Sequence, residues 1–281
     1  MDAAVARRMW MTTEPLHAVI YFAPEAKAAF DLAGMKGFWM GYFAGRAAPM
    51  GPVPPEVVTA TFFNFHPDMV RRAIPDAWGF APPERVLEAR LEGAGAALER
   101  LTDGADLSAA VEPAVRAAES VDTVGRALAA ANASLPWPDG DVLKLWHALT
   151  ILREFRGDGH VSALVSEGID GCEAHVLLSA AGAVPAERLR GARGWSEDDW
   201  AAAADRLQAR GWLDGVGALT DAGRDVRDRV EARTDALALG PWVALGEDGC
   251  ETLVGALAPA LAALKANEAI PYPNPMGLPP A

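Results

Sequence analysis

The stretch RGWSEDDWAAAADRLQARGWLDGVGALTDAGRDVRDRVEARTDALA, residues 193–238, carries the clearest structural pattern in the chain. Its first part predicts a helix with well-marked ends. Ser196 is a typical N-cap, and Asp199, three residues later, completes a variant of the capping box. Gly211 is a typical residue for ending the same helix.

The segment after this helix predicts a wing. Residues 212–219 contain two glycines and fit two very short strands joined by a tight turn. Thr220 can then cap a long charged helix over residues 221–237. A helix, a tight hairpin and a second capped helix follow one another here in the order of a winged helix.

Helical periodicity dominates the rest of the chain. Alanine-rich segments with Leu and Val at helical spacing recur throughout, and strand-like alternation is nearly absent. In the first half we expect helices near residues 3–12, 15–32, 36–46, 54–63, 67–73, 83–101, 107–118 and 120–133. The predicted fold class is all-α, with tandem helical helix-turn-helix or winged-helix units and one short β-hairpin wing.

The strongest break in this pattern is SLPWPDG, residues 134–140, where two prolines and a glycine fall within seven residues. It predicts a boundary between an aromatic-rich N-terminal helical domain, residues 1–134, and a C-terminal helix-turn-helix or winged-helix domain, residues 141–266. Residues 267–281 contain five prolines and predict an extended tail without helix.

The C-terminal half begins with a predicted cluster of three helices. Asp141 is a candidate N-cap for the first helix, which the RGDG sequence at residues 156–159 is expected to end. Asp158 can cap the second helix, which Gly168 closes. The third is expected over about residues 172–181.

Two resemblances follow from these residues. LQARGWL, from Leu207, and LTDAGR, from Leu219, resemble the second helix, wing and following helix of the MarR-like winged-helix regulators. The whole chain resembles an actinobacterial helix-turn-helix family without an established activity. That resemblance rests on HAVIYFAPEA from His17, GYFAGRAAPMGPV from Gly41, FFNFHPDMVRRAIPDAW from Phe62 and RGDGHVSALV from Arg156. It implies a tandem helical architecture and implies no activity.

The charge of the chain disfavours nucleic acid as a partner. The formal net charge is −13 and the sequence pI is about 4.8, whereas proteins that neutralise phosphates usually present a surplus of Lys and Arg. The expected recognition helix sets four acidic residues against two arginines: Glu197, Asp198, Asp199 and Asp205 against Arg206 and Arg210. We therefore expect this helix to serve packing or homodimerisation, and we expect poor affinity for generic duplex DNA.

The first half combines many aromatic residues with selected polar ones, which is the usual composition of a small-molecule pocket. The alternative is an ordinary aromatic core. The candidate ligand-binding residues are His17, Tyr21, Trp39, Tyr42, Arg46, Asn64, His66 and His160. Arg46 lies in an apolar run and needs an anionic partner, either a carboxylate such as Glu56 or a ligand. We expect Arg46 at a cavity that Tyr42 and at least one of His17 or His66 also line.

No motif assigns catalytic residues, a cofactor or a metal site. The five histidines have no strong metal-ligand spacing, and nucleophile elbows and glycine-rich phosphate loops are missing from the sequence. Cys172 and Cys250 are far apart, as expected of a reduced cytoplasmic protein. No apolar stretch is long and uninterrupted enough to predict a membrane span.

Three functions remain open. We favour a small-molecule-binding protein on a winged-helix-type scaffold that is not primarily DNA-binding. The second is a MarR-like DNA-binding transcriptional regulator that acts as a dimer. The third is an enzyme that uses His17, His66 or His160 as acid or base, which requires that these histidines converge on one cavity.

Overall fold

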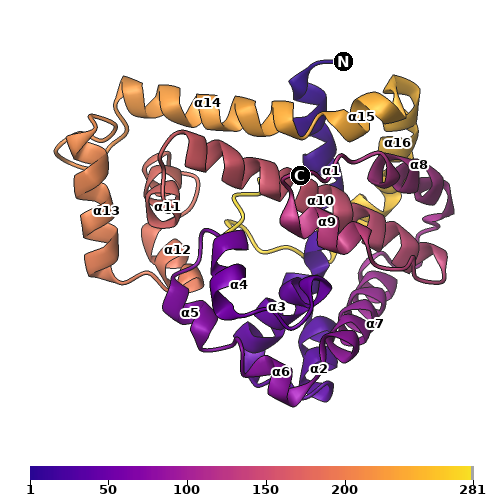
Figure 1. The fold of residues 1–281 in the computed structure, drawn as a ribbon. Coiled ribbons are helices and arrows are strands. Elements are labelled where there is room, and N and C mark those ends of the chain that lie inside the picture. The colour runs from indigo at the N-terminus through magenta and orange to yellow at the C-terminus, as the bar shows by residue number, and fades with distance from the viewer. Residues whose placement is uncertain (280–281) are drawn as a thin grey trace.

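The computed structural model describes residues 1–279 of the chain. They form sixteen α-helices and one short 3-10 helix, joined by loops (Figure 1). The first half contains α1 (Ala3–Phe22), α2 (Pro24–Leu32), α3 (Gly37–Ala47), η1 (Ala48–Met50), α4 (Pro55–Thr61), α5 (Pro67–Arg71), α6 (Ala77–Phe80), α7 (Pro83–Leu101), α8 (Ser108–Glu119) and α9 (Ala127–Ala133). The second half contains α10 (Asp141–Ser166), α11 (Gly171–Ala180), α12 (Ala186–Arg193), α13 (Glu197–Ala209), α14 (Asp221–Leu237), α15 (Gly240–Leu245) and α16 (Glu247–Ala266). The prediction of an all-α protein is confirmed.

The helix ends around the expected wing are as predicted. Ser196 caps α13 by accepting a hydrogen bond from the backbone of Asp199, whose carboxylate accepts one from the backbone of Ser196 in return. Thr220 caps α14 by accepting a hydrogen bond from Gly223 at 3.0 Å. Short polar side chains at these two positions satisfy amide groups that have no partner within the helix.

The prediction of two strands between α13 and α14 was wrong. Within residues 1–279 the structure contains no β-strand, and this segment forms a single antiparallel bridge between Leu213 and Leu219. The Asp214 carboxylate accepts hydrogen bonds from the backbone of Val216 at 3.0 Å and Ala218 at 2.9 Å. A side chain thus satisfies amides that a strand ladder would otherwise use.

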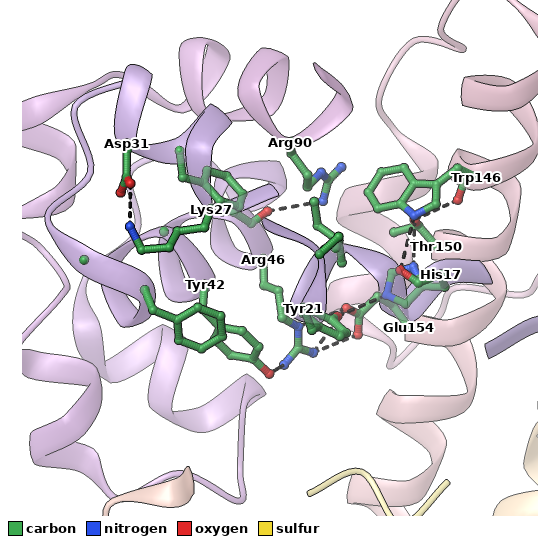
Figure 2. Close-up of a pocket in the computed structure, with 17 residues that line it drawn as sticks. His17, Tyr21, Lys27, Asp31, Tyr42, Arg46, Arg90, Trp146, Thr150 and Glu154 are labelled. Atoms are coloured by element: carbon green, nitrogen blue, oxygen red, sulfur yellow. Dashed lines mark hydrogen bonds and ion pairs between the residues drawn. The ribbon is translucent and has the colours of Figure 1, made fainter. Parts of the chain in front are cut away.

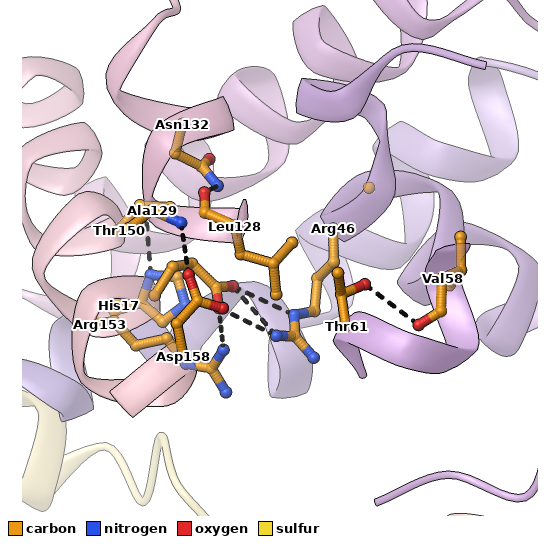
Figure 3. Close-up of polar contacts among 12 residues, drawn as sticks. His17, Arg46, Val58, Thr61, Leu128, Ala129, Asn132, Thr150, Arg153 and Asp158 are labelled. Carbon is orange, nitrogen blue, oxygen red and sulfur yellow. Dashed lines mark hydrogen bonds and ion pairs between the residues drawn. The ribbon is translucent and has the colours of Figure 1, made fainter. Parts of the chain in front are cut away.

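The predicted break at residues 156–159 was also wrong, because α10 runs through it as one helix of 26 residues. Asp158 does not begin a helix, because it lies within α10. Its carboxylate instead accepts a hydrogen bond from the backbone of Ala129 at the start of α9, at 3.0 Å (Figure 3). A Cβ atom at Gly159 would lie 2.8 Å from the Arg126 guanidinium and 3.2 Å from Leu237 Cβ, so this glycine permits close packing. Both residues serve contacts between helices, although their sequence is typical of a turn.

Smaller differences concern helix boundaries. The structure has one continuous helix, α1, where we expected a break between residues 12 and 15, and Pro15 lies inside it. The expected helix over 120–133 is confined to α9, and α12 was not predicted at all. The expected Asp141 cap is replaced by Gly140, because α10 already includes Asp141.

Two hydrophobic cores organise the helices. The larger core contains buried residues of α1–α10 together with α15 and α16, and the smaller core lies between α10, α11, α13 and α14. The larger core therefore contains residues from both sides of the predicted boundary at residues 134–140. The division into two domains stays a prediction.

The C-terminal segment after α16 has no helix, as predicted, over residues 267–279. Figure 1 shows it, in yellow, running back through the middle of the molecule. Its Ile270 and Leu278 are buried against Trp10 and Tyr21 of α1, and the Asn274 side chain is fully buried. The tail is therefore a packed element. Residues 280 and 281 of the predicted tail lie outside the described residues.

Among the described helices, α16 alone is long and apolar enough to span a membrane by length and composition. Its Leu253, Leu257, Ala260 and Leu264 are nevertheless buried in the larger core, and it contacts α1 and α8. Only 28% of its apolar window is buried, and one such helix is weak evidence for a membrane span. The cytoplasmic location stays a prediction.

Candidate functional site

Two cavities lie beside α1 and α10, the two helices that both of them share. The narrow pocket is lined by α1, α2, α3, α7 and α10 and has a volume of about 30 Å³. The large cavity is lined by α1, α10, α11, α12, α14 and the C-terminal tail and has a volume of about 390 Å³. A volume of 30 Å³ holds only one or two water molecules, whereas 390 Å³ is within the range of small-molecule sites.

The narrow pocket contains a directed hydrogen-bond chain (Figure 2). Thr150 donates its hydroxyl hydrogen to the carbonyl of Trp146 at 2.9 Å, so it accepts from His17 Nδ1 at 3.2 Å. His17 Nε2 then accepts from the Tyr21 hydroxyl at 3.0 Å. Burial lowers the pKa of His17 well below its ordinary value, which keeps the ring neutral. Thr150, His17 and Tyr21 therefore all have hydrogen-bond partners within the protein.

Arg46 enters the same pocket and is held by Glu154 (Figures 2 and 3). Three hydrogen bonds of 3.0 to 3.2 Å join its Nε and Nη2 to the Glu154 carboxylate, and its Nη1 donates to the Tyr42 hydroxyl at 3.2 Å. Burial alone would raise the pKa of Glu154, but Arg153 and Arg46 lower it to about 2. Glu56, the carboxylate considered from the sequence, is exposed and has no such role.

The predicted site residues are therefore only partly brought together. His17, Tyr21, Tyr42 and Arg46 line the narrow pocket, as expected for Arg46 with Tyr42 and one histidine. Trp39 instead packs on Tyr42, Phe43 and Phe65. His66 caps α5 and lies at the edge of Trp195, while Asn64 and His160 line the large cavity.

Arg90 is the unbalanced charge of the narrow pocket, which it lines from α7. It is 5% exposed and donates to the Gly45 carbonyl at 3.3 Å and to Asn132 Oδ1 at 3.1 Å. No carboxylate within residues 1–279 forms an ion pair with it. Burial lowers its pKa to about 10.

The large cavity is rich in arginine, although the protein as a whole is acidic. Five arginines line it, against two carboxylates: Arg7, Arg153, Arg156, Arg193 and Arg227 against Glu14 and Glu231. Trp10 and the side chains of Leu164, Ile169, Leu177 and Val230 supply apolar surface. The cavity therefore combines cationic and apolar walls.

Three of these arginines have acidic partners. Arg7 pairs with Glu231 and, at 3.1 Å, with Asp235, which also lies 2.8 Å from Arg156. Arg153 contacts Glu154 at 2.6 Å and Glu14 at 3.7 Å. Arg153 thereby joins the charge cluster of the narrow pocket to the wall of the large cavity.

The other two arginines form no ion pair within the described chain. Arg193 donates to the carbonyls of Ala192 at 3.3 Å and Pro275 at 2.9 Å, and its guanidinium lies 4.5 Å from the Phe65 ring centroid. Burial lowers its pKa, and the nearby Arg46 and Arg153 lower it further. Arg227 donates to the Leu177 carbonyl at 3.4 Å. These two guanidinium groups are uncompensated cations at the cavity wall.

Arg193 and two other residues of the large cavity also have atoms without a hydrogen-bond partner. Asn64 Oδ1, His175 Nε2 and Arg193 Nε are buried and unpaired, and all three residues line the large cavity. His175 is 3% exposed, and burial together with Arg193 lowers its pKa to about 3. Buried polar atoms in native proteins usually have partners, so a cluster of exceptions in one cavity points to a missing ligand or water.

Sequence reasoning selected Asn64 and His160 but missed the rest of this set. Arg153, Arg193 and Arg227 come from three helices that are far apart in the sequence, and each is unremarkable in its local pattern. His175 is one of the five histidines, whose spacing was considered only for metal binding. No group of three or more potential metal ligands occurs among the described residues.

Comparison with known proteins is limited to the family level. A model of a helix-turn-helix family matches residues 6–271, which is nearly the whole chain. No curated protein and no solved structure matches it. The family match does not test the resemblance to MarR-like regulators or the actinobacterial origin. The chain belongs to this helix-turn-helix family.

Proposed function

We propose that this protein binds a small organic anion in the large cavity, on a helix-turn-helix scaffold. The observation that carries the proposal is the pair of uncompensated guanidinium groups, Arg193 and Arg227, at a cavity of about 390 Å³. Burying a cation without an anionic partner is costly, and an anionic ligand would remove that cost. The apolar wall gives the body of such a ligand a surface to pack against.

Small-molecule binding was also the function favoured from the sequence, but the proposed site is now the large cavity and not the narrow pocket. The narrow pocket predicted from the aromatic residues has too small a volume for an organic molecule, and Arg46 already has Glu154 as its partner. The large cavity shares Asn64 and His160 with the predicted site. The ligand we propose therefore lies on the other side of the Arg153–Glu154 pair.

The experiment is a thermal-shift panel of organic acids, each matched with its neutral primary amide. Several acids should raise the melting temperature of the full chain at millimolar concentration, and their amides should raise it less, because bound ligand stabilises the folded state. Arg227→Met should weaken the effect of the acids. Arg224→Met is the matched control, since Arg224 is an exposed residue one turn earlier on α14 and pairs with Asp221. Equal shifts by acids and amides would overturn the proposal.

DNA binding is the second candidate, and the family supports it. The charges of α13 argue against it. Its first turn holds three acidic residues, and Arg206 pairs with Asp170 at 2.6 Å and Glu173 at 2.8 Å. Arg210, just after the helix, pairs with Glu173 at 2.5 Å. The two arginines of this segment that could contact phosphate are therefore already paired with carboxylates of α11 and its N-cap.

We therefore expect binding to generic duplex DNA at physiological salt to be weaker than the roughly 10⁻⁴ to 10⁻⁶ M dissociation constants of nonspecific binders. A fluorescence-anisotropy titration of a labelled duplex measures this. Tighter binding at that salt concentration would favour a DNA-binding regulator over a small-molecule-binding protein.

The enzyme hypothesis required that His17, His66 and His160 share a cavity. They do not: His17 lines the narrow pocket, His160 lines the large cavity, and His66 lines neither. We make no catalytic proposal for them.

A further inference from the structure

We propose that the ligand is a hydroxy acid, an organic acid with a hydroxyl group beside its carboxylate, and that Asn64, His175 and Arg193 bind this polar end. The inference rests on the proposed function and names the ligand class. It is based on three buried atoms without a partner, Asn64 Oδ1, His175 Nε2 and Arg193 Nε, in residues that line the same cavity.

The three residues come from different elements that are held together by hydrogen bonds. Asn64 lies between α4 and α5, His175 in α11, and Arg193 at the end of α12. The Trp195 indole donates to the Asn64 carbonyl at 3.0 Å, and the His66 amide donates to the Arg193 carbonyl at 2.9 Å. These bonds fix the α4–α5 loop against the end of α12. The subsite is therefore assembled before any ligand binds.

Two of the three groups can accept a hydrogen bond. Burial and the nearby Arg193 lower the pKa of His175, so the ring is neutral, and Nε2 presents a lone pair in the tautomer that carries its hydrogen on Nδ1. Asn64 Oδ1 is a carbonyl oxygen. A simple carboxylate has no hydrogen to give and would leave both acceptors unsatisfied, whereas a hydroxyl group can donate to one of them.

The third group can only donate. Two nitrogens of Arg193 are used by the Ala192 and Pro275 carbonyls, and its Nε has no partner. An anionic oxygen beside Nε would accept this hydrogen bond and would compensate the charge of the guanidinium. A carboxylate with an adjacent hydroxyl therefore pairs the Arg193 donor and one of the two acceptors.

The rest of the cavity defines the body of the ligand. Leu164, Ile169, Leu177 and Val230 line it, with Trp10 on the α1 side. Such walls favour an apolar substituent, aliphatic or aromatic, on the hydroxy acid. 3-Phenyllactate has this chemistry, and 3-phenylpropionate differs from it only by lacking the hydroxyl group.

The test is isothermal titration calorimetry of the full chain with each enantiomer of 3-phenyllactate and with 3-phenylpropionate. We expect one enantiomer to bind about tenfold more tightly than 3-phenylpropionate, because its hydroxyl group pairs a buried acceptor that 3-phenylpropionate leaves unpaired. His175→Leu should abolish this preference while 3-phenylpropionate still binds. If that variant does not fold, Asn64→Leu and the wild-type ratio still test the subsite.

Arg193→Met should weaken both acids at least tenfold. Arg188→Met is its matched control, because Arg188 also donates to a tail carbonyl, that of Pro273, but is exposed and does not line the cavity. Arg188→Met should leave both affinities and their ratio unchanged.

The outcomes separate the two proposals. Equal affinities of wild type for all three acids, or a preference that survives both His175→Leu and Asn64→Leu, would overturn the hydroxy-acid inference and leave anion binding intact. Binding of the neutral amides as tight as that of the acids would overturn the proposed function. If none of the three acids binds, the hydroxy-acid inference is overturned. The thermal-shift panel of organic acids then tests the proposed function separately.

Discussion

The narrow pocket and the large cavity share α1 and α10 but differ in how their charges are compensated. In the narrow pocket, Arg46 has a carboxylate partner and His17 has partners at both ring nitrogens. In the large cavity, Arg193 and Arg227 have only carbonyl partners, and His175 Nε2 has none. Residue type alone therefore does not distinguish a binding site from a core. Cavity volume and the balance of charges and hydrogen-bond partners do.

Arg46 is the residue on which the charge balance of the narrow pocket most depends. Arg46→Met should lower the free energy of unfolding by about 3 kcal/mol without any ligand, the lower end of the range for a broken buried ion pair, because the buried Glu154 carboxylate keeps Arg153 as a partner. Urea unfolding measures the change. Arg116→Met is the control, since Arg116 forms an exposed pair with Glu112 and should give a change too small to resolve. An unchanged free energy of unfolding in Arg46→Met would mean that the Arg46–Glu154 ion pair does not stabilise the narrow pocket.

Arg90 tests the exception within the narrow pocket. Arg90→Met removes an uncompensated cation but leaves the Gly45 carbonyl and Asn132 Oδ1 without a donor. We expect a loss of about 1–3 kcal/mol in the free energy of unfolding, smaller than for Arg46→Met. A loss equal to that of Arg46→Met would show that a carboxylate partner is not what distinguishes the two arginines.

The pH dependence of stability should report on the large cavity through His175. Its folded pKa is about 3, lowered by burial, Arg193 and His160, whereas an unfolded histidine titrates near its ordinary value of 6.5. Below that pH the unfolded chain binds a proton that the folded chain does not, so stability falls as pH falls. His175→Gln should reduce the slope between pH 6 and pH 5 by up to about 1.4 kcal/mol per pH unit.

Urea unfolding of both proteins at several pH values measures these slopes. The comparison stays above pH 5, because Glu154, with its pKa lowered to about 2, also costs stability as pH falls below the usual range of glutamate. Identical slopes in the wild type and His175→Gln would contradict a neutral, buried imidazole at this wall.

Arg193 should show the smallest effect in the absence of ligand. Arg193→Met leaves no carboxylate without a partner, and the bonds that it removes, to the carbonyls of Ala192 and Pro275, are only part-buried, unlike those of Arg90. We therefore expect the free energy of unfolding to change by less than about 1 kcal/mol, with either sign. The same variant should lose acid binding, so stability and affinity separate at this residue. A loss as large as that for Arg46→Met would assign Arg193 a structural role instead.

The helical class, the caps at Ser196 and Thr220, and the extended tail were predictable because each depends on local chemistry. A capping side chain reaches an amide three residues away, and proline lacks the amide that a helix interior requires. The helix-turn-helix family was equally accessible from the sequence, since its pattern covers nearly the whole chain. The helical class, the caps and the tail depend on residues close together in the chain, whereas the family depends on a pattern spread along all of it.

The continuous α10 and the large cavity depended on contacts between residues far apart in the sequence. Asp158 and Gly159 form part of a helix because α9 and α14 supply their neighbours, and nothing within a few residues indicates this. Arg46 found its carboxylate in Glu154, 108 residues away, while Arg193 and Arg227 found none. The sequence by itself determined which side chains were available for ion pairs. Only the tertiary structure decided which were paired, because electrostatic compensation of a buried charge depends on distance in space and not on separation along the chain.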